Sequence, residues 1–581
     1  MRNPNTKAVS ERRVADLLKR EFRGIGVYLF GVSGIINILA LTGAFYMLQI
    51  YDRALTSGSV PTLLALSALA IGLYLFQGLF DVVRSQILVR IGARLDKKFA
   101  PIAHKVAIDM PRFGFSTAES LERGRDVDTV RSFLSSQGPM AIFDLPWVPV
   151  FLAFVYLLHP ALGALTLGGA VILTLLTVLN ELMSRRLAGA TQQAAVTRNA
   201  VADSNARNAE ILKAMGFANR AVRRYDTANS EHVSLQTQSS DISGTLGAFS
   251  RVLRMLLQSA VLGLGAYLTI MGDLSAGAII AASVAATRAL APIDLAIGNW
   301  KSVIASRNAM RRLRDTMVAI GEAKEPMQLP APSQRLLVDK ITVAAPGNGR
   351  VLLTDVGFEL SAGQALGIIG PSAGGKTTLA KAVTGIWPAV RGGVRLDGAE
   401  LGQWGEDVLG HHVGYLPQDV GLLDATIWEN ISRLADQRDG KRIVAAAMAA
   451  GVHDMIVHFE DGYDTQVGPQ GTALSAGQRQ RIGLARALYG DPFLVVMDEP
   501  NSNLDADGEA ALTAAINGIK ARGGIAIIIA HRPSALVAVD LVAVIQNGRL
   551  GSFGRKDEIL PANRTGPRPV KVASEVQELT A

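Results

Sequence analysis

The chain has 581 residues, of which 49% are hydrophobic, and its 58 lysine and arginine against 50 aspartate and glutamate residues leave a net charge of +8. This length exceeds what one hydrophobic core organises, and the apolar fraction is high for soluble domains, so the composition favours a two-part membrane protein. The cysteine count is zero, which excludes disulfides, thiolate metal sites and cysteine nucleophiles.

The first half of the chain carries long apolar runs that are candidate membrane spans. Between four and six spans can be counted, and we adopt six, because each run approaches or exceeds the roughly 20 residues that cross a bilayer. The first run is too long for a secretory signal and lacks a small-residue cleavage site, so we expect an uncleaved span. The six runs form three pairs: 25–50 with 60–83, 141–158 with 161–183, and 252–271 with 276–297.

Lysine and arginine gather on one side of these spans. They are frequent in the N-terminal segment 1–24 and between the second and third spans, whereas the opposite turns hold only Arg53. The positive-inside rule therefore predicts a cytoplasmic N-terminus, cytoplasmic long loops and a cytoplasmic C-terminal half. This bias accounts for the basic excess, so we expect the lipid bilayer and no nucleic acid as a partner.

The transmembrane domain is predicted to cover 25–320, with a proline-marked linker at 321–334. Its polar stretches 84–138 and 184–247 read as helical extensions of the spans. Within the spans, Asp144 is predicted to cap the third helix. Arg288 and Asp294 in the sixth span either line a polar pathway or form an ion pair with each other, because buried charges in membranes are costly.

The second half opens with a glycine-rich phosphate-binding pattern, G-x-x-x-x-G-K-[ST], directly after the apolar run 365–369. Backbone N–H groups of such a loop and of the following helix point at phosphate oxygens. Lys376 is expected to reach the β and γ phosphates of ATP, and the Thr377 hydroxyl to bind Mg²⁺. The predicted nucleotide-binding residues are Gly370, Pro371, Ser372, Ala373, Gly374, Gly375, Lys376, Thr377 and Thr378.

Two carboxylates follow a second apolar run, 494–497. Ligands of parallel α/β sheets bind at the carboxyl ends of strands, so this position faces the same edge as the glycine-rich loop. Asp498 suits Mg²⁺ coordination, and Glu499 suits a general base that polarises the attacking water.

Four further motifs in the same order make this half resemble the nucleotide-binding domain of ABC transporters. They are the signature Leu474, Ser475, Ala476, Gly477 and Gln478, the glutamine Gln418, the segment 502–505, and His531 after the run 525–529. The resemblance implies catalytic roles for Gln418 and His531, with Gln418 also near Mg²⁺. It also implies that the signature acts on the ATP of a second subunit, hence a homodimer with two equivalent sites.

The pattern departs from the family at four places. Ala373 and Ala476 stand where glycine is usual, and the alanine at 373 is expected to strain the turn. The adenine-stacking aromatic expected near 345–347 is missing, and 467–471 lacks the glutamate common before exporter signatures.

Over residues 10–560 the chain resembles the protease-exporter branch of type I secretion ATPases, on the phrases at 144–147, 367–373 and 498–505. The resemblance implies an inner-membrane exporter of an unfolded protein with a C-terminal signal, acting with a membrane-fusion adaptor and an outer-membrane channel. A lipid, drug or peptide exporter is the alternative; a regulatory ATPase ranks last, because Glu499 and His531 are both present. The expected fold is a six-helix membrane domain, then an α/β P-loop cassette at 335–560 and a flexible tail at 561–581.

Overall fold

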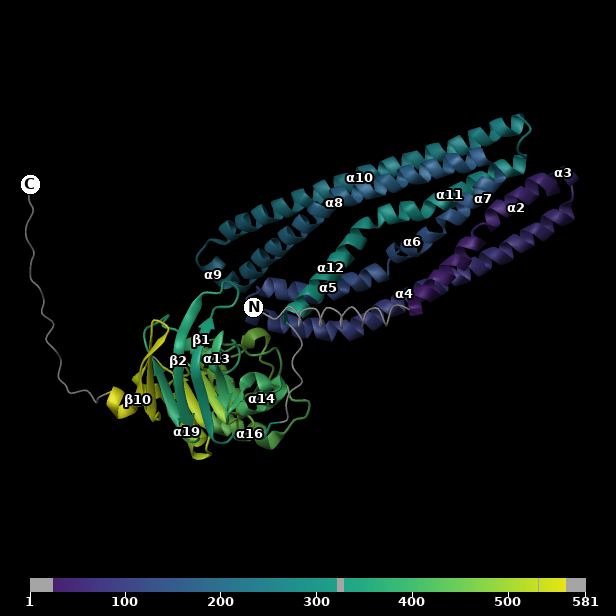
Figure 1. Ribbon diagram of the computed structural model, residues 1–581. Helices are drawn as coiled ribbons and strands as arrows, with labels where there is room; N and C mark the ends of the chain where they lie inside the picture. Colours follow the sequence, from purple (N-terminus) through teal and green to yellow (C-terminus); the bar gives the residue numbers. More distant parts are fainter. Residues whose placement is uncertain (1–23, 321–328, 531, 561–581) are drawn as a thin grey trace, which may run out of the picture. The chain divides into compact units, whose positions relative to one another are not determined.

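The computed structural model describes residues 24–320, 329–530 and 532–560, and these fall into two compact units that meet in sequence between residues 320 and 329. The first unit is entirely helical and the second is an α/β domain, as Figure 1 shows. The predicted N-terminal segment, the tail at 561–581 and most of the linker lie outside the described residues.

The described part of the first unit contains six helical segments long and apolar enough to cross a membrane, so the prediction of six spans is confirmed. The six segments match the six apolar runs, and only the fifth, Ala218–Ile270, ends one residue before the end of its run 252–271. The first segment, residues 24–57, passes through a π-helical turn at Ile50–Ala54. The helices of the first unit are α2 (Thr42–Gln49), α3 (Leu55–Ser57), α4 (Val60–Asp109), α5 (Thr117–Leu134), α6 (Gly138–Asp144), α7 (Val148–Leu158), α8 (Pro160–Arg207), α9 (Ala209–Ala214), α10 (Ala218–Ile270), α11 (Ala276–Gly298) and α12 (Trp300–Ile320).

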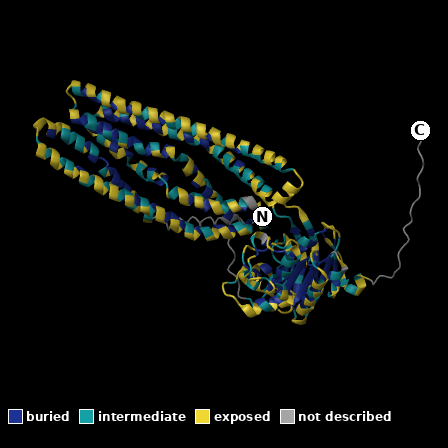
Figure 2. Cartoon of the chain, turned by 180° about the vertical axis from the view of Figure 1, so that it is seen from behind, coloured by how far each residue is buried: buried dark blue, intermediate teal, exposed yellow. Residues whose placement is uncertain are grey.

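The polar stretches between spans are helical, and α4, α8 and α10 run from apolar span into polar segment without a break. Turns between spans form where the backbone is capped: His159 accepts a hydrogen bond from the Ala161 N–H and Pro160 starts α8. Many apolar side chains on the outer helix faces stay exposed, Leu75 at 70%, which Figure 2 shows as yellow stripes. Such a surface is stable in lipid and not in water.

Asp144 does not cap the third span, contrary to the prediction. It is the last residue of α6, and its carboxylate accepts hydrogen bonds from Arg84 at 2.7 Å and from Asn37 at 2.9 Å. Arg84 is 5% exposed and also contacts Asp81 at 2.8 Å. A carboxylate buried between helices needs a cation as a partner. Arg84 lies 60 residues from Asp144 in sequence, so local capping rules could not identify this partner.

Arg288 and Asp294 do not pair with each other either. Asp294 accepts from the Ser250 hydroxyl at 2.7 Å and forms an ion pair with Arg254 at 3.0 Å, both on the neighbouring helix α10. The alternative of a mutual ion pair is therefore wrong. Arg288 lies on the exposed side of α11.

The second unit contains two sheets. A four-stranded antiparallel sheet has the order β2-β1-β4-β5, and a six-stranded sheet has the order β10-β9-β3-β8-β7-β6, in which β9, β3, β8, β7 and β6 are parallel. The strands are β1 (Arg335–Ala344), β2 (Val351–Ser361), β3 (Ala365–Ile369), β4 (Arg391–Leu396), β5 (Ala399–Glu400), β6 (Val413–Leu416), β7 (Leu494–Asp498), β8 (Ile525–Ile529), β9 (Leu541–Gln546) and β10 (Arg549–Arg555). The helices are α13 (Lys376–Val383), α14 (Glu406–His412), α15 (Ile427–Ile431), α16 (Gly440–Ala449), α17 (His453–Val457), α18 (Ala476–Leu488), α19 (Ala506–Ala521) and α20 (Lys556–Ile559).

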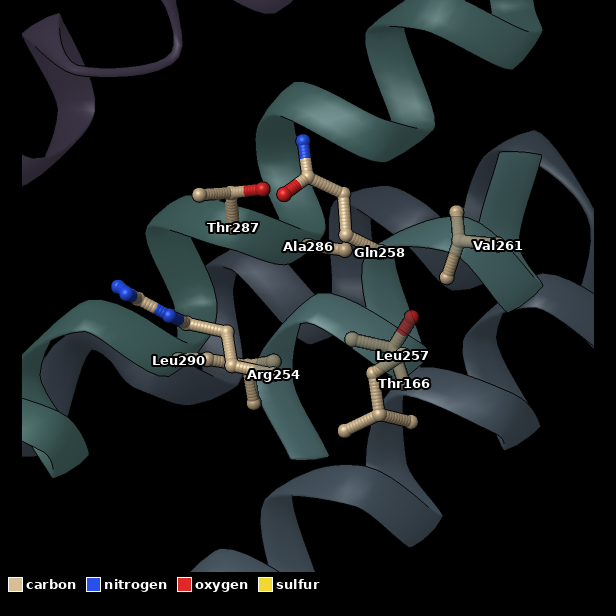
Figure 3. A pocket seen from close by; sticks show the side chains of 8 residues that line it. All are labelled: Thr166, Arg254, Leu257, Gln258, Val261, Ala286, Thr287 and Leu290. Atoms are coloured by element: carbon tan, nitrogen blue, oxygen red, sulfur yellow. The ribbon is translucent and has the colours of Figure 1, made fainter. Parts of the chain in front are cut away.

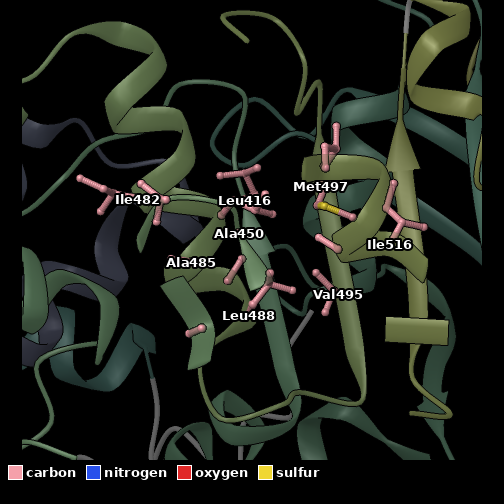
Figure 4. Packing of buried hydrophobic residues seen from close by; sticks show 14 of the residues in the cluster. Leu416, Ala450, Ile482, Ala485, Leu488, Val495, Met497 and Ile516 are labelled. Atoms are coloured by element: carbon pink, nitrogen blue, oxygen red, sulfur yellow. The ribbon is translucent and has the colours of Figure 1, made fainter. Parts of the chain in front are cut away.

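Both faces of the parallel sheet are covered, because alternate residues of β7 enter different cores. Val495 and Met497 pack with α16, α18 and α19, as Figure 4 shows for several of their contacts. Leu494 and Val496 pack with α13 and the antiparallel sheet. All five residues of β7 are buried, which explains its continuous apolar run. The sheet is thereby a rigid support for the loops at its carboxyl edge.

Candidate nucleotide site

The glycine-rich loop joins β3 to α13 at the carboxyl edge of the parallel sheet. Gly370 has φ of 150°, and a Cβ there would lie 2.0 Å from the Ile545 carbonyl oxygen. The Gly374 carbonyl accepts from the Gly548 N–H at 3.0 Å, so the turn between β9 and β10 holds the loop from one side. Pro371, Ser372 and Ala373 remain exposed at its tip.

Ala373 adopts the left-handed conformation, with φ of 61°. An L-residue pays about 1–2 kcal/mol there, whereas glycine adopts it freely and loses about 0.5–1 kcal/mol through its freer unfolded chain. The strain expected from the alanine is therefore present in the loop.

We expect Ala373→Gly to raise the temperature at which the full-length protein loses ATP binding, because the left-handed strain is relieved. The β-branched Ala373→Val should lower that temperature, since its side chain fits positive φ worse than alanine. A lower temperature for Ala373→Gly than for the natural protein would contradict this account of the loop.

Lys376 is the first residue of α13 and is 5% exposed. Its ammonium donates to the carbonyl oxygens of Gly370 at 2.9 Å and Pro371 at 2.8 Å, so it lies within the curl of the loop. Burial lowers its pKa, and the nearby carboxylates of Glu499 and Asp498 act against that shift. The cation is thus held among the loop carbonyls beside both acids.

Asp498 ends β7 and is fully buried. Both carboxylate oxygens lack a hydrogen bond, although the Thr377 hydroxyl lies close enough to oppose the rise in pKa that burial causes. A buried carboxylate without donors fits a hard cation such as Mg²⁺, which takes one or two protein oxygens together with phosphate oxygens and water. Among the described residues no group of three acidic or histidine side chains could hold a metal ion by itself.

Strand register brings the predicted residues to one edge of the sheet. Ile529 of β8 lies opposite both Ile368 of β3 and Asp498 of β7, so the loop and the acid are two strand spacings apart, about 10 Å. Leu416 of β6 lies opposite Met497, which places Gln418 just beyond the same edge. His531 follows β8 but lies outside the described residues.

Glu499 follows Asp498 in a strained turn. Its φ is 50°, unusual for a residue with a long side chain, and its N–H donates to the Ile529 carbonyl at 3.0 Å. Left-handed residues of this kind concentrate at functional sites because the surrounding structure holds them in place. The residue is half-buried, in contrast to the five fully buried residues of β7 before it.

The signature residues start helix α18. Ser475 caps the helix by accepting from the Gln478 N–H at 3.2 Å, and the Gln478 side chain accepts from the Ser475 N–H at 2.8 Å. This capping box gives Gln478 a structural purpose that the motif resemblance did not supply. Leu474 is buried, whereas Ser475 and Ala476 are exposed at the helix N-terminus.

The two small residues of the signature differ in whether the position requires glycine. Ala476 is the first helical residue, where a Cβ is tolerated, which explains why alanine can replace glycine there. At Gly477 a Cβ would approach the Asn503 carbonyl oxygen to 2.9 Å, so this position requires glycine.

Helix α18 is bound to the turn that follows Glu499. The buried Gln480 side chain donates to the Pro500 carbonyl at 3.0 Å, and Arg481 forms an ion pair with Asp505. Asp505 in turn accepts from the Gly508 N–H and caps α19. Motif matching located these segments but did not reveal that they contact each other.

The turn from β1 to β2 is closed by a hydrogen bond from the Ala345 N–H to the Arg350 carbonyl at 2.7 Å. It contains no aromatic residue, in agreement with the missing adenine-stacking side chain.

Comparison with known proteins decides the family. The ABC transporter family model matches residues 353–502, and that of the ABC transporter transmembrane region matches 27–290. The type I secretion system ATP-binding protein PrsD of Rhizobium meliloti (strain 1021) is 48% identical over 96% of this chain and 96% of its own. The chain belongs to the ABC transporters of type I secretion.

More distant relatives of this ABC transporter agree. The leukotoxin translocation ATP-binding protein LktB of Mannheimia haemolytica is 27% identical over 93% of this chain and 77% of its own. The structure of a bacterial Atm1-family ABC exporter with ATP bound matches with a TM-score of 0.79 at 22% identity, over 93% of this chain and 96% of that one. The second match shows the fold alone. The protein is thus a multi-pass membrane ATPase with the ABC exporter fold, and its nucleotide-binding cassette occupies the second unit.

Proposed function

We propose that this ABC transporter is a homodimeric inner-membrane exporter that uses ATP to move an unfolded polypeptide out of the cytoplasm. The proposed ATP hydrolysis is supported mainly by one observation: the same edge of the sheet holds Lys376, Thr377, Asp498 and Glu499. The 48% identity to PrsD over nearly the whole of both chains supports the secretion function.

In the proposed site, the loop residues Gly370 to Thr378 bind the phosphates and Lys376 neutralises the β and γ oxygens. Thr377, Asp498 and Gln418 hold Mg²⁺, which supplies further charge neutralisation when bound. Glu499 accepts a proton from the water that attacks γ-phosphate, and His531 contacts that phosphate. Hydrolysis in such sites depends mainly on positioning and charge stabilisation.

The dimer follows from where the signature lies. Ser475 and Ala476 are exposed at the start of a 13-residue helix, whose unpaired N–H groups and dipole favour an anion. In our proposal they complete the ATP site of the second subunit, so that ATP binding closes the dimer. Each chain then contributes a loop to one site and a signature to the other.

The cargo is proposed to be a protein with a C-terminal signal, delivered through a membrane-fusion adaptor and an outer-membrane channel. The test uses the purified full-length dimer in lipid nanodiscs. The C-terminal fragment of a protein secreted from a neighbouring gene should bind and change the ATPase rate, whereas a scrambled fragment should not. Equal responses to both fragments, with a clear response to a lipid panel, would replace protein export by lipid export.

A further inference from the structure

The six apolar runs contain six charged residues, all of them within the described part of the chain: Asp81, Asp144, Glu181, Arg254, Arg288 and Asp294. Five have a partner in the same chain: Asp81 and Asp144 with Arg84, Glu181 with Arg307, and Arg254 with Asp294. Arg288 alone has no ion pair or side-chain hydrogen bond with any described residue. An unpaired cation inside a membrane is costly and is retained where it has a function.

The position of Arg288 excludes a lipid headgroup as its usual partner. It lies near the middle of α11, about 18 Å along the helix from Ala276 at 1.5 Å per residue. The hydrocarbon core is about 30 Å thick, so both headgroup layers are roughly half that thickness away. Its guanidinium therefore needs water or another anion at mid-depth.

Arg288 belongs to the one open face of an otherwise buried helix. Of the apolar part of α11, 61% is buried. One face stays partly or fully exposed, and its residues follow the spacing i, i+4, i+7, i+11: Val284, Arg288, Ala291 and Leu295. A lipid-facing surface would not carry a charge at this depth. This face is therefore directed at an aqueous space or at a second subunit.

A second copy of the chain offers no free acid to Arg288 at this depth. Every aspartate and glutamate in the apolar runs already contacts an arginine of its own chain. An ion pair between subunits would require breaking one of these pairs, which leaves a buried charge without compensation.

Polar groups continue next to Arg288. Thr287 lines a small pocket between α8, α10 and α11 together with Arg254 and Gln258 of α10, and Figure 3 shows the Gln258 amide facing Thr287. Arg254 and Gln258 are four residues apart, so they lie on the same side of α10. Water-compatible groups thus extend from the open face of α11 onto the adjacent helix.

We propose that the open face of α11 lines the aqueous conduit between the two subunits, and that Arg288 binds carboxylates of acidic segments in the polypeptide that passes through it. This inference rests on the proposed export of a polypeptide by a homodimer. It adds a cargo class, chains rich in aspartate or glutamate, and a residue that selects them.

Because the natural chain has no cysteine, a single thiol can report on water at this face. In the full-length dimer in nanodiscs, Arg288→Cys should react with a charged, membrane-impermeant thiol reagent about tenfold faster than Leu75→Cys, since the hydrocarbon core holds no water. Leu75 is the control because it is 70% exposed on the apolar part of α4. Equal rates for the two variants would overturn the conduit.

The second experiment tests the chemistry of the cargo. A soluble peptide in which aspartate alternates with serine should bind the natural dimer more tightly than its asparagine counterpart of equal length. Arg288→Ala should weaken binding of the aspartate peptide by up to about fivefold, the value of an exposed ion pair, and Arg288→Lys should retain most of it. Added salt should reduce the difference.

The Arg288 variants should form dimers of natural size and unfold at the temperature of the natural protein, which verifies that they fold. Equal binding of the two peptides, or equal loss with Arg288→Ala and Arg288→Lys, would overturn the role in carboxylate binding. The proposed function has its own test, and it fails if the natural C-terminal fragment and its scrambled version give the same response. Fast thiol reaction at position 288 would still establish an aqueous conduit in that case.

Discussion

The Lys376→Ala protein should hydrolyse ATP only at background rate, a loss of at least about 10²–10³-fold. The ammonium of Lys376 lies within the curl of the glycine-rich loop, 2.8–2.9 Å from two loop carbonyl oxygens, and no other lysine or arginine among the described residues bonds to those carbonyls. Removing it leaves the negative charge on the transferred phosphoryl group without this neutralising cation. The measurement is phosphate release by the purified full-length protein in nanodiscs.

Lys441→Ala is the matched control, because Lys441 is an exposed lysine in the first turn of α16. It should keep the natural rate. Hydrolysis by Lys376→Ala at a rate close to that of this control would mean that the loop does not bind the phosphates of ATP.

The Glu499→Gln protein should bind ATP normally and hydrolyse it about 10²-fold or more slowly, as expected when a general base is lost. The amide keeps the size of the side chain, so the strained turn after β7 should remain intact. Slow hydrolysis should trap the closed, ATP-bound dimer. Nucleotide binding, single-turnover hydrolysis and the fraction of closed dimers by electron microscopy measure the three effects.

Asp507→Asn provides the comparison for Glu499→Gln, because Asp507 is an exposed carboxylate eight residues later in the first turn of α19. It should hydrolyse ATP normally. Finding only open dimers of Glu499→Gln at saturating ATP would contradict the assignment of Glu499 as base.

Patterns of neighbouring residues were enough to predict the membrane spans, strand β7 and the glycine-rich loop. Six apolar runs gave six spans, and the run 494–497 gave the buried strand β7 with its two carboxylates at the end. The loop between β3 and α13 was recognisable because phosphate binding requires glycine at fixed spacing. The strain at Ala373 was also predictable, because alanine stands there where the family usually has glycine.

Contacts between distant segments could not be predicted in this way. Asp144 was predicted to cap a helix, whereas its carboxylate bonds to Arg84 on another helix. For Asp294, an ion pair with the nearby Arg288 was one of two alternatives, whereas the structure pairs it with Arg254 of α10. The contact of Gln480 with the Pro500 carbonyl depends on how α18 packs against the sheet. Single-sequence spacing carries no information on which helix faces which.

The bonds between α18 and the segment 500–505 make the two ATP sites of the proposed dimer interdependent. Gln480 and Arg481 attach the helix that serves the partner's nucleotide to the turn that carries the chain's own Glu499. A shift of that turn during one hydrolysis event therefore displaces the signature at the other site. The two hydrolysis events in such a dimer are expected to be cooperative rather than statistically independent.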